Sequence, residues 1–336
     1  MTYAVERSSI GGQPIVVLRS DAGHRVHIAG RGAALISFEI PRAGRPFDIA
    51  AGHRDAAEIV ARPGSRFAIM VPFAGRVAEA RYAFDGREYD LQPGAAPGQR
   101  EFRHGFVRDA DFAVAALVAD SRSARTTLST RIRAQPGYPF AIDLEVTFTL
   151  DAAGLALEAR IRNAGTEPAP CFFGWHPYFR VSDGRADEWL LEVPARKLIR
   201  TGTDLIPLPG DAAYERLEDA PELDFRRSRM IGGCILDQEY TDLVADTDGR
   251  IRTRLTDSKS GFGVIVWQER GVMHVFTGDT LKRDARRSVA LEPMESMANA
   301  FNRPECAASI RLDPGAERVY RCGVAPAPEP APFKSK

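Results

Sequence analysis

The sequence predicts an all-β protein, built as a large β-sandwich with few short helices. Three observations predict this class. Apolar and polar residues alternate with a period of two along many short segments, as in residues 142–150. Turn signals separate these segments at intervals of about 8–12 residues, as is typical of sandwiches and barrels. No segment carries a sustained apolar stripe at the 3.6-residue spacing of a helix.

The individual elements follow from the same periodicity, taken in chain order. Residues 81–91 alternate around Asp85-Gly86, and an Asp-Gly pair between two alternating runs predicts a β-hairpin. Asp248-Gly249 predicts a second tight turn. The other strands are expected at 142–150, 155–161, 242–247, 250–257, 261–267, 273–278 and 288–292, the last ending in Pro293. Short helical turns are expected at 56–62 and 295–301.

The chain has 336 residues, of which 44% are hydrophobic, and this is ample material for a core. No linker rich in proline, glycine or serine divides its middle. We therefore expect a single sandwich domain over residues 1–323. Residues 324–336 read VAPAPEPAPFKSK, which predicts a flexible proline-rich C-terminal tail.

Charge and cysteine usage exclude several classes of function. The 45 basic and 45 acidic residues cancel, so a nucleic-acid partner is not expected. Only five of the basic residues are lysine, which leaves 40 arginines. The four cysteines lie far apart without metal-ligand spacing, so neither a metal nor a disulfide is expected. No apolar run is long enough for a membrane span, and we expect a cytoplasmic protein that is a monomer or homodimer.

Two residues stand in contexts that suit proton transfer. His176 lies in FGWHPYF, where aromatic side chains surround it and Pro177 favours an extended backbone at the histidine. Aromatic rings beside a histidine suit sugar binding, although a core histidine in an aromatic cluster explains the motif as well. Glu292 ends the apolar segment 289–291, where desolvation would raise its pKa and make it a base. The alternative is a solvated strand end or a structural partner of an arginine.

Three further polar residues are weaker candidates. His104 lies in RHGFVRD, where the following glycine permits an unusual backbone; an exposed loop histidine is the alternative. Arg76 and Asp237 each follow apolar sequence and carry no signal on their own. The sequence contains no nucleophile elbow, P-loop, dinucleotide-binding glycine motif or HExxH zinc motif.

Taken in order, the segments PFAGRV, FDGREYDL, RHGFVRD, FGWHPYF, CILDQEYTDL, VFTGDTL and ALEPMESMANAFN resemble the aldose 1-epimerase (mutarotase) family. The resemblance implies a galactose mutarotase-like sandwich that converts the α and β anomers of a free aldose without a cofactor or metal. By the same resemblance, Glu292 takes the proton of the C1 hydroxyl and His176 protonates the ring oxygen. His104, Arg76 and Asp237 would hold the sugar.

The sequence departs from the family pattern at two positions. Gly75 stands where an asparagine usually precedes the arginine, and Met294 stands where galactose-type members have glutamine. The glycine is expected to leave room for a bulkier substituent near Arg76, which favours a modified or acidic hexose, for example a sulfonated or phosphorylated one. The alternative function is a catalytically silent carbohydrate-binding protein of the same fold. A glycoside hydrolase is disfavoured because it would need two carboxylates flanking the glycosidic bond, and here the second candidate residue is a histidine.

Overall fold

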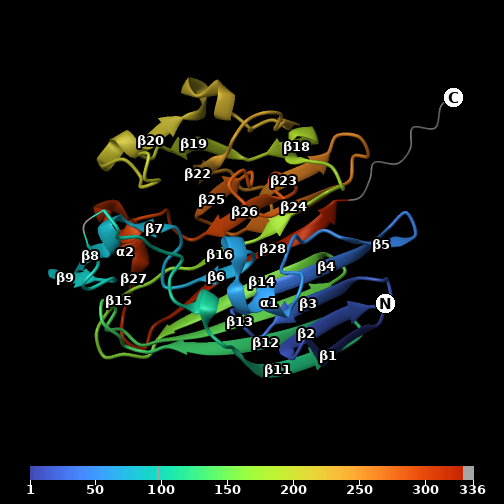
Figure 1. The fold of residues 1–336 in the computed structure, drawn as a ribbon, viewed down its shortest axis with the longest axis horizontal. Coiled ribbons are helices and arrows are strands. Elements are labelled where there is room, and N and C mark those ends of the chain that lie inside the picture. Colours follow the sequence, from blue (N-terminus) through green and yellow to red (C-terminus); the bar gives the residue numbers. More distant parts are fainter. Residues whose placement is uncertain (97, 328–336) are drawn as a thin grey trace.

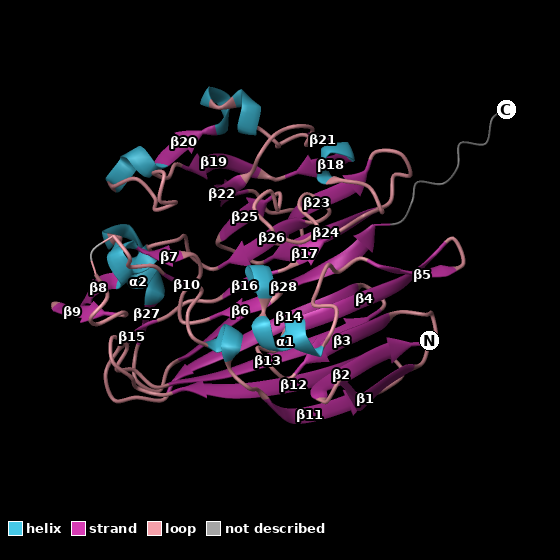
Figure 2. Cartoon of the chain, viewed as in Figure 1, coloured by secondary structure: helices cyan, strands magenta, loops and turns pink. Residues whose placement is uncertain are grey.

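The computed structural model describes residues 1–96 and 98–327, and strands dominate it (Figures 1 and 2). An N-terminal sheet of five strands forms a simple antiparallel meander. Its strands, in spatial order, are β1 (Tyr3–Ile10), β2 (Gln13–Ser20), β3 (Arg25–Ala29), β4 (Leu35–Arg42) and β5 (Arg45–Asp48). In Figure 1 this blue sheet lies against the green strands that follow it in the chain.

The largest sheet of the sandwich has nine antiparallel strands. Its strands, in spatial order, are β11 (Ala113–Ala119), β12 (Ser123–Ile132), β13 (Ile142–Asp151), β14 (Gly154–Asn163), β28 (Glu317–Ala327), β24 (Gly263–Gln268), β23 (Ile251–Asp257), β18 (Trp189–Glu192) and β21 (Arg229–Met230). Along β13 every second residue is buried, which is the pattern of a sheet with one face in the core.

The third large sheet has eight strands and carries the polar residues of interest. Its path runs through β20 (Tyr214–Arg216), β19 (Ala195–Ile199), β22 (Asp237–Leu243), β25 (Val272–Phe276), β26 (Val289–Met294), β16 (Gly174–His176) and β6 (Ala68–Met70), with β17 (Tyr178–Phe179) paired to β26. Buried side chains of all three sheets join in one continuous apolar cluster. The single-domain organisation over 1–323 stays a prediction.

Small elements complete the fold. The two-stranded sheets are β7 (Arg76–Val77) with β10 (Phe102–Arg103), β8 (Arg81–Phe84) with β9 (Arg87–Asp90), and β15 (Ala169–Pro170) with β27 (Arg311–Leu312). The α-helices are α1 (Ala56–Ala61) and α2 (Ala307–Ile310). The 3₁₀ turns are η1 (Pro63–Ser65), η2 (Ala78–Ala80), η3 (Val107–Asp109), η4 (Ala186–Glu188), η5 (Gly210–Ala213), η6 (Leu217–Asp219), η7 (Pro221–Leu223), η8 (Ala300–Asn302) and η9 (Pro304–Cys306). Within the described ranges, no helix is long and apolar enough to cross a membrane.

The all-β sandwich with few short helices is confirmed, and so are most of the expected strands. The 81–91 hairpin forms with Asp85 and Gly86 both at positive φ, as a two-residue hairpin turn requires. The helical turn expected at 56–62 is α1, which begins after Asp55, whose side chain accepts a hydrogen bond from the Glu58 backbone N–H.

Three expectations about element boundaries are wrong. No strand covers 242–247: β22 ends at Leu243, and β22 and β23 belong to different sheets, so the Asp248-Gly249 turn does not join a hairpin. The strand expected at 288–292 continues through Pro293 to Met294. No helix spans 295–301; only 300–302 form a 3₁₀ turn. In that segment the N–H of Glu295 donates to Phe173 and that of Asn299 to Arg76, so tertiary hydrogen bonds replace helical ones.

The first residues of the segment predicted as a flexible tail belong to a strand instead. Strand β28 runs to Ala327, with Val324 facing Leu155 of β14 and Val266 of β24. Pro326 lies beyond the end of its pairing with β14, so its missing N–H leaves no gap on that side of the ladder. Residues 328–336, the rest of the expected tail, lie outside the described residues.

Candidate active site

Strand register lines up four polar side chains on one face of the eight-stranded sheet. Glu239 of β22 lies opposite His274 of β25, and His274 lies opposite Glu292 of β26. The antiparallel pairing of Gly174 with Met294 then brings His176 of β16 beside Glu292. Because side chains alternate between the two faces of a sheet, all four point the same way. The row forms the floor of a cavity of about 690 Å³.

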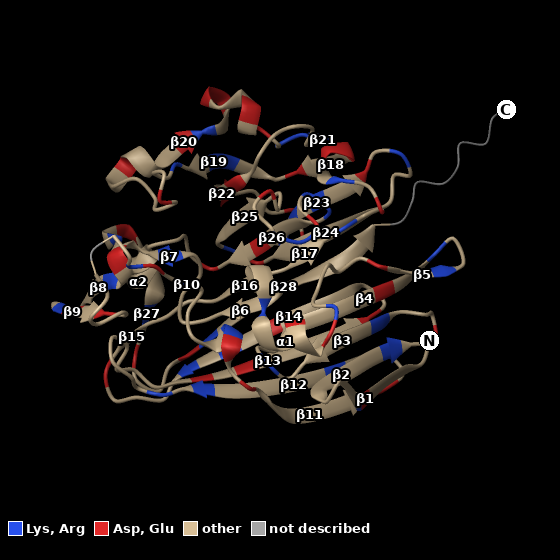
Figure 3. Ribbon diagram, viewed as in Figure 1, with Lys and Arg blue, Asp and Glu red and all other residues tan. Residues whose placement is uncertain are grey.

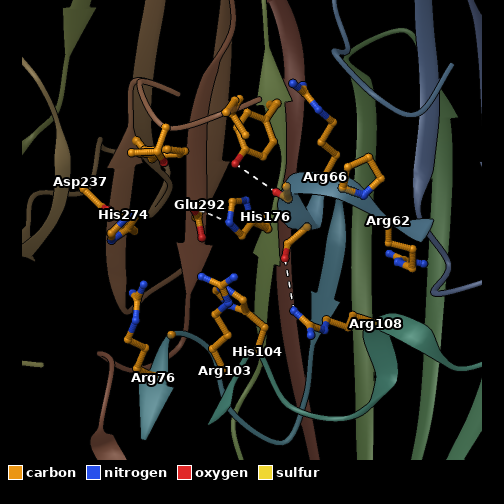
Figure 4. Close-up of a pocket in the computed structure, with 18 of the residues that line it drawn as sticks. Arg62, Arg66, Arg76, Arg103, His104, Arg108, His176, Asp237, His274 and Glu292 are labelled. Atoms are coloured by element: carbon orange, nitrogen blue, oxygen red, sulfur yellow. Dashed lines mark hydrogen bonds and ion pairs between the residues drawn. The ribbon is translucent and has the colours of Figure 1, made fainter. Parts of the chain in front are cut away.

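His176 and Glu292 form a direct pair at the centre of this floor. The Nε2 atom of His176 lies 3.3 Å from Oε1 of Glu292, and the two residues are only 7% and 2% exposed. Figure 4 shows the two side chains facing each other. The ring of Tyr178 stacks on the His176 ring, with the two centroids 5.0 Å apart. The His104 ring contacts the His176 ring edge-on, at a centroid distance of 5.2 Å. These rings fix the imidazole orientation without a hydrogen bond to Nδ1, which has no partner among the described residues.

Burial sets the protonation of this pair. Burial raises the pKa of Glu292 to about 8; the neighbouring His274 opposes that rise, whereas Asp237 and Glu239 add to it. Burial, together with the positive charge of His274, lowers the pKa of His176 to about 3. Between these values Glu292 is protonated and His176 is uncharged, so the pair holds one proton that it can transfer.

His274 is the fixed cation of the row. Its Nε2 lies 2.9 Å from Oδ1 of Asp237 and its Nδ1 lies 4.0 Å from Oε1 of Glu239. Burial opposes its charge, but the carboxyl groups of Glu292, Asp237 and Glu239 raise the pKa of His274 to about 9. The same contact lowers the pKa of Asp237 despite the opposing effect of burial, so this carboxylate stays charged at neutral pH.

His104 reaches the cavity from a strained turn below the row. His104 and Gly105 both have positive φ, and the His104 N–H donates to the Gly75 carbonyl at 2.9 Å. A Cβ at Gly105 would lie 2.1 Å from the Val71 carbonyl oxygen, so only glycine fits there. Burial and the nearby His176 lower the pKa of His104, which keeps this ring neutral.

The structure brings all five residues predicted from the sequence to this one cavity: Arg76, His104, His176, Asp237 and Glu292. Their roles stay predictions. Glu295, the acidic residue nearest in sequence, points elsewhere, because its Oε1 lies 2.5 Å from Arg270 and its Oε2 accepts from the Phe173 N–H. Among the described residues, no group of three or more His, Cys, Asp or Glu side chains is arranged to hold a metal ion.

Sequence reasoning missed His274, Glu239 and most of the cavity's arginines. The segment VMHVF does carry a signal, since a histidine interrupts an otherwise apolar strand. The role of this histidine depends on the register of β25 with β22 and β26, which the sequence does not specify.

A sequence model described as aldose 1-epimerase matches residues 14–324. The chain belongs to the aldose 1-epimerase family. This confirms the resemblance seen in the sequence. The uncharacterized protein YihR of Escherichia coli is 28% identical over 240 residues, which cover 70% of this chain and 71% of that protein. Galactose mutarotase of Sus scrofa is 27% identical over 160 residues, 47% of this chain and 45% of that protein.

Solved structures show that this epimerase family member shares the galactose mutarotase-like fold. A GalM/aldose epimerase homologue from C. elegans superposes with a TM-score of 0.80 at 19% identity, covering 92% of this chain and 97% of that one. A galactose 1-epimerase from Lactobacillus acidophilus gives a TM-score of 0.79 at 16% identity, covering 97% and 98%. At these identities the likeness concerns the fold alone.

Ala298 fills the position that a side chain at Gly75 would enter first. Gly75 has φ 67°, and a Cβ built on it would lie 2.6 Å from Cβ of Ala298. Ala298 is itself held by its N–H, which donates to the Glu239 carboxylate at 3.1 Å. Ala298 therefore occupies the Cβ side of Gly75, whereas Gly75 itself lines the cavity beside Arg76, so room for a bulkier substituent there stays a prediction.

Replacing Gly75 by the family's usual asparagine is expected to destabilise this chain. Asparagine tolerates positive φ better than most residues, but its Cβ would overlap Ala298, and such overpacking costs about 1–3 kcal/mol. Gly75→Asn should lower the melting temperature, and adding Ala298→Gly should recover part of the loss. Thermal unfolding of the two variants beside wild type measures this; an unchanged melting temperature for Gly75→Asn alone would contradict the packing argument.

Proposed function

We propose that the chain is an aldose 1-epimerase that interconverts the α and β anomers of a free aldose by ring opening, with a modified or acidic hexose as its substrate. The observation that carries the proposal is the 3.3 Å contact between His176 and Glu292 on the cavity floor. Opening a pyranose needs a base at O1 and an acid at the ring oxygen, and this pair supplies one group for each.

The chemical steps can be followed with these two side chains. When a sugar binds over the pair from the cavity side, the proton of the pair moves onto His176 and Glu292 becomes a carboxylate. Glu292 then takes the O1 proton, the O1 electron pair forms the C1 carbonyl, and the C1–O5 bond breaks. His176 gives its proton to O5. After rotation about C1–C2 the same groups act in reverse on the other face of the carbonyl.

The other polar residues hold the substrate in this proposal. Asp237 stays charged and accepts hydrogen bonds from sugar hydroxyls, Arg76 donates hydrogen bonds to them, and the neutral His104 donates or accepts. His274 supports Glu292 electrostatically, because its positive charge favours the carboxylate that the step requires. Held in this way, the reacting atoms stay within reach of both proton-transfer groups.

The competing function is sugar binding without catalysis. Binding alone requires neither a buried carboxyl group nor a histidine facing it, and burying both is costly. Exchange NMR on glucose, galactose, glucose 6-phosphate and glucuronate decides between the two functions. We expect faster anomer exchange than in buffer for at least one of these sugars; binding of a sugar with no acceleration would support the silent alternative.

The pH profile of kcat/KM should reflect the single proton of the pair. Activity is expected to be level between about pH 5 and 7. It should fall by about tenfold per pH unit above about 8, because the deprotonated pair has no proton left for the ring oxygen. His274→Gln removes the cation that lowers the pKa of Glu292, so the decline should move to higher pH. A rate that rises through pH 8 would contradict the one-proton mechanism, and a decline that vanishes in His274→Gln would assign it to His274.

A further inference from the structure

The cavity is more basic than the chain around it. Over the whole sequence positive and negative charges cancel, and Figure 3 shows both signs interspersed along the strands. Besides the charged His274, seven arginine and lysine residues line the cavity: Arg62, Arg66, Arg76, Arg103, Arg108, Lys282 and Arg283. Five carboxyl residues line it, and two of these, Glu239 and Glu292, have raised pKa values. The excess positive charge is therefore local to this cavity.

Two of these cations face each other across a short ladder. Arg76 of β7 and Arg103 of β10 are directly opposite partners. Like charges in such positions destabilise a strand pair. Both approach one carboxylate, Glu101, at 3.7 and 3.4 Å from its Oε1, and the Glu101 side chain is 57% exposed. One solvated carboxylate between two arginines leaves a positive charge at the cavity wall.

A second pair repeats this arrangement. Arg62 and Arg108 approach Asp109 at 3.7 and 3.2 Å, and the Asp109 side chain is 53% exposed. Arg62 is buried, and its Nε and Nη2 have no hydrogen-bond partner among the described residues. Burial, opposed by Asp109 but reinforced by Arg31 and Arg108, lowers the pKa of Arg62 to about 10. The long contact with Asp109 and one hydrogen bond from Nη1 to the Arg31 carbonyl, at 3.0 Å, offset only part of the cost of burying this charge.

The remaining arginines are engaged structurally. Arg66 donates to the Ala51 carbonyl at 2.6 Å and lies over the Tyr178 ring, which in turn stacks on His176. Arg283 is neutralised by Glu58 at 2.8 Å and Asp284 at 2.7 Å. Arg76 is already assigned to the sugar hydroxyls and Lys282 is exposed, so Arg103 and Arg108 are the cations best placed to meet a charged substituent. They flank His104 in one segment of chain, and Figure 4 shows both side chains directed toward the centre of the cavity.

The position of these two arginines relative to the His176–Glu292 pair defines what they would meet. In a pyranose, C5 bears the exocyclic carbon and is bonded to the ring oxygen, whereas C2 and C3 extend from C1 on the other side. With O1 at Glu292 and O5 at His176, C2 and C3 point toward Asp237 and His274. The exocyclic carbon then points past His176, to the side where Figure 4 places Arg108 and Arg62, and Arg103 lies below the His176–Glu292 pair, between Arg76 and Arg108.

We propose that Arg103 and Arg108 form an anion subsite, which selects aldoses that carry an oxyanion, such as phosphate, sulfate or carboxylate, on the exocyclic carbon next to the ring oxygen. This inference rests on the proposed function, since it uses the assignment of O1 and O5. Arg108 presents its guanidinium beside the Ser65 hydroxyl, at 3.4 Å, so an oxyanion there meets both a cation and a neutral donor. The positive charge of Arg62 also stabilises the bound anion.

An anion in this subsite also acts on the chemistry. Arg103 is one of the charges that lower the pKa of His176. A bound oxyanion cancels that charge and favours the protonated His176 that ring opening requires. The subsite should therefore raise kcat for charged sugars as well as lower their KM.

The test compares glucose with glucose 6-phosphate, glucose 6-sulfate and glucuronate in exchange NMR. We expect kcat/KM to be at least about tenfold higher for one or more charged sugars than for glucose. Hydrogen bonds to charged groups are worth about 1.5–3 kcal/mol, so Arg103→Gln or Arg108→Gln should each lower the charged-to-neutral ratio by about tenfold to a hundredfold. Added salt should weaken the preference in wild type. The kcat/KM values of the three charged sugars show whether the subsite prefers a phosphate, a sulfate or a planar carboxylate.

Arg131→Gln is the matched control, because Arg131 is an exposed arginine of β12 that pairs with Asp143 of β13, and its substitution should leave the ratio unchanged. Equal kcat/KM for glucose and all charged sugars would overturn the subsite and leave the epimerase proposal standing. If no sugar exchanges faster than in buffer, the epimerase proposal fails. Calorimetric titration then still decides the subsite: it requires glucose 6-phosphate or glucose 6-sulfate to bind more tightly than glucose, with the preference lost in Arg108→Gln.

Discussion

Glu292→Gln is expected to slow catalysed anomer exchange by roughly 10²–10⁴-fold, the usual contribution of a positioned proton-transfer group. Glutamine keeps the size of the side chain and can donate to Nε2 of His176, but it cannot take the O1 proton. The fold should survive, because burial already raises the pKa of Glu292 to about 8 and keeps the group uncharged at neutral pH. The loss should appear in kcat, with KM changed little.

Exchange NMR at raised enzyme concentration measures this residual rate above the spontaneous reaction. Glu145→Gln offers a matched control, since Glu145 is an exposed residue of β13 on the outer face of the sandwich. A Glu292→Gln variant that melts like wild type yet exchanges anomers at the wild-type rate would show that Glu292 is not the base.

His176→Asn is expected to give a loss of similar size, about 10²–10⁴-fold, because the ring oxygen then loses its proton donor. Asparagine is smaller and leaves the Tyr178 ring without its stacking partner, so a modest drop in melting temperature should accompany the loss. The buried Nδ1 has no partner among the described residues, so the substitution breaks no hydrogen bond there.

His24→Asn is the corresponding control, since His24 lies outside this cavity and packs edge-on against Phe38. A His176→Asn variant with a raised KM and an unchanged kcat would give His176 a binding role and remove it from the proton-transfer step.

Local patterns predicted most of the fold because they act within a few residues. The alternation at 142–150 and 155–161 becomes β13 and β14, and Asp85-Gly86 becomes a hairpin turn. The failures lie where tertiary contacts decide. The segment at 295–301 forms no helix because its backbone groups bond to other parts of the chain, and Val324 to Ala327 extend β28 because β24 offers them a ladder.

The candidate site shows the same division. His176 and Glu292 could be named because their immediate neighbours, an aromatic cluster and an apolar strand, predict burial. His274 could not, because its role depends on its register with Glu239 and Glu292 in separate strands. The two arginine pairs that share Glu101 and Asp109 could not be predicted either. The 40 arginines are spread over the sequence, which does not indicate which of them lie together at a cavity wall.

The central claim is that Glu292 and His176 act as one proton-transfer unit, and a double-mutant cycle tests it most directly. Exchange rates are measured for wild type, Glu292→Gln, His176→Asn and the double variant on the same sugar. Because each group needs the other to complete ring opening, the double variant should be about as slow as the slower single variant. Losses that multiply in the double variant would mean that the two residues act independently, and would contradict the account.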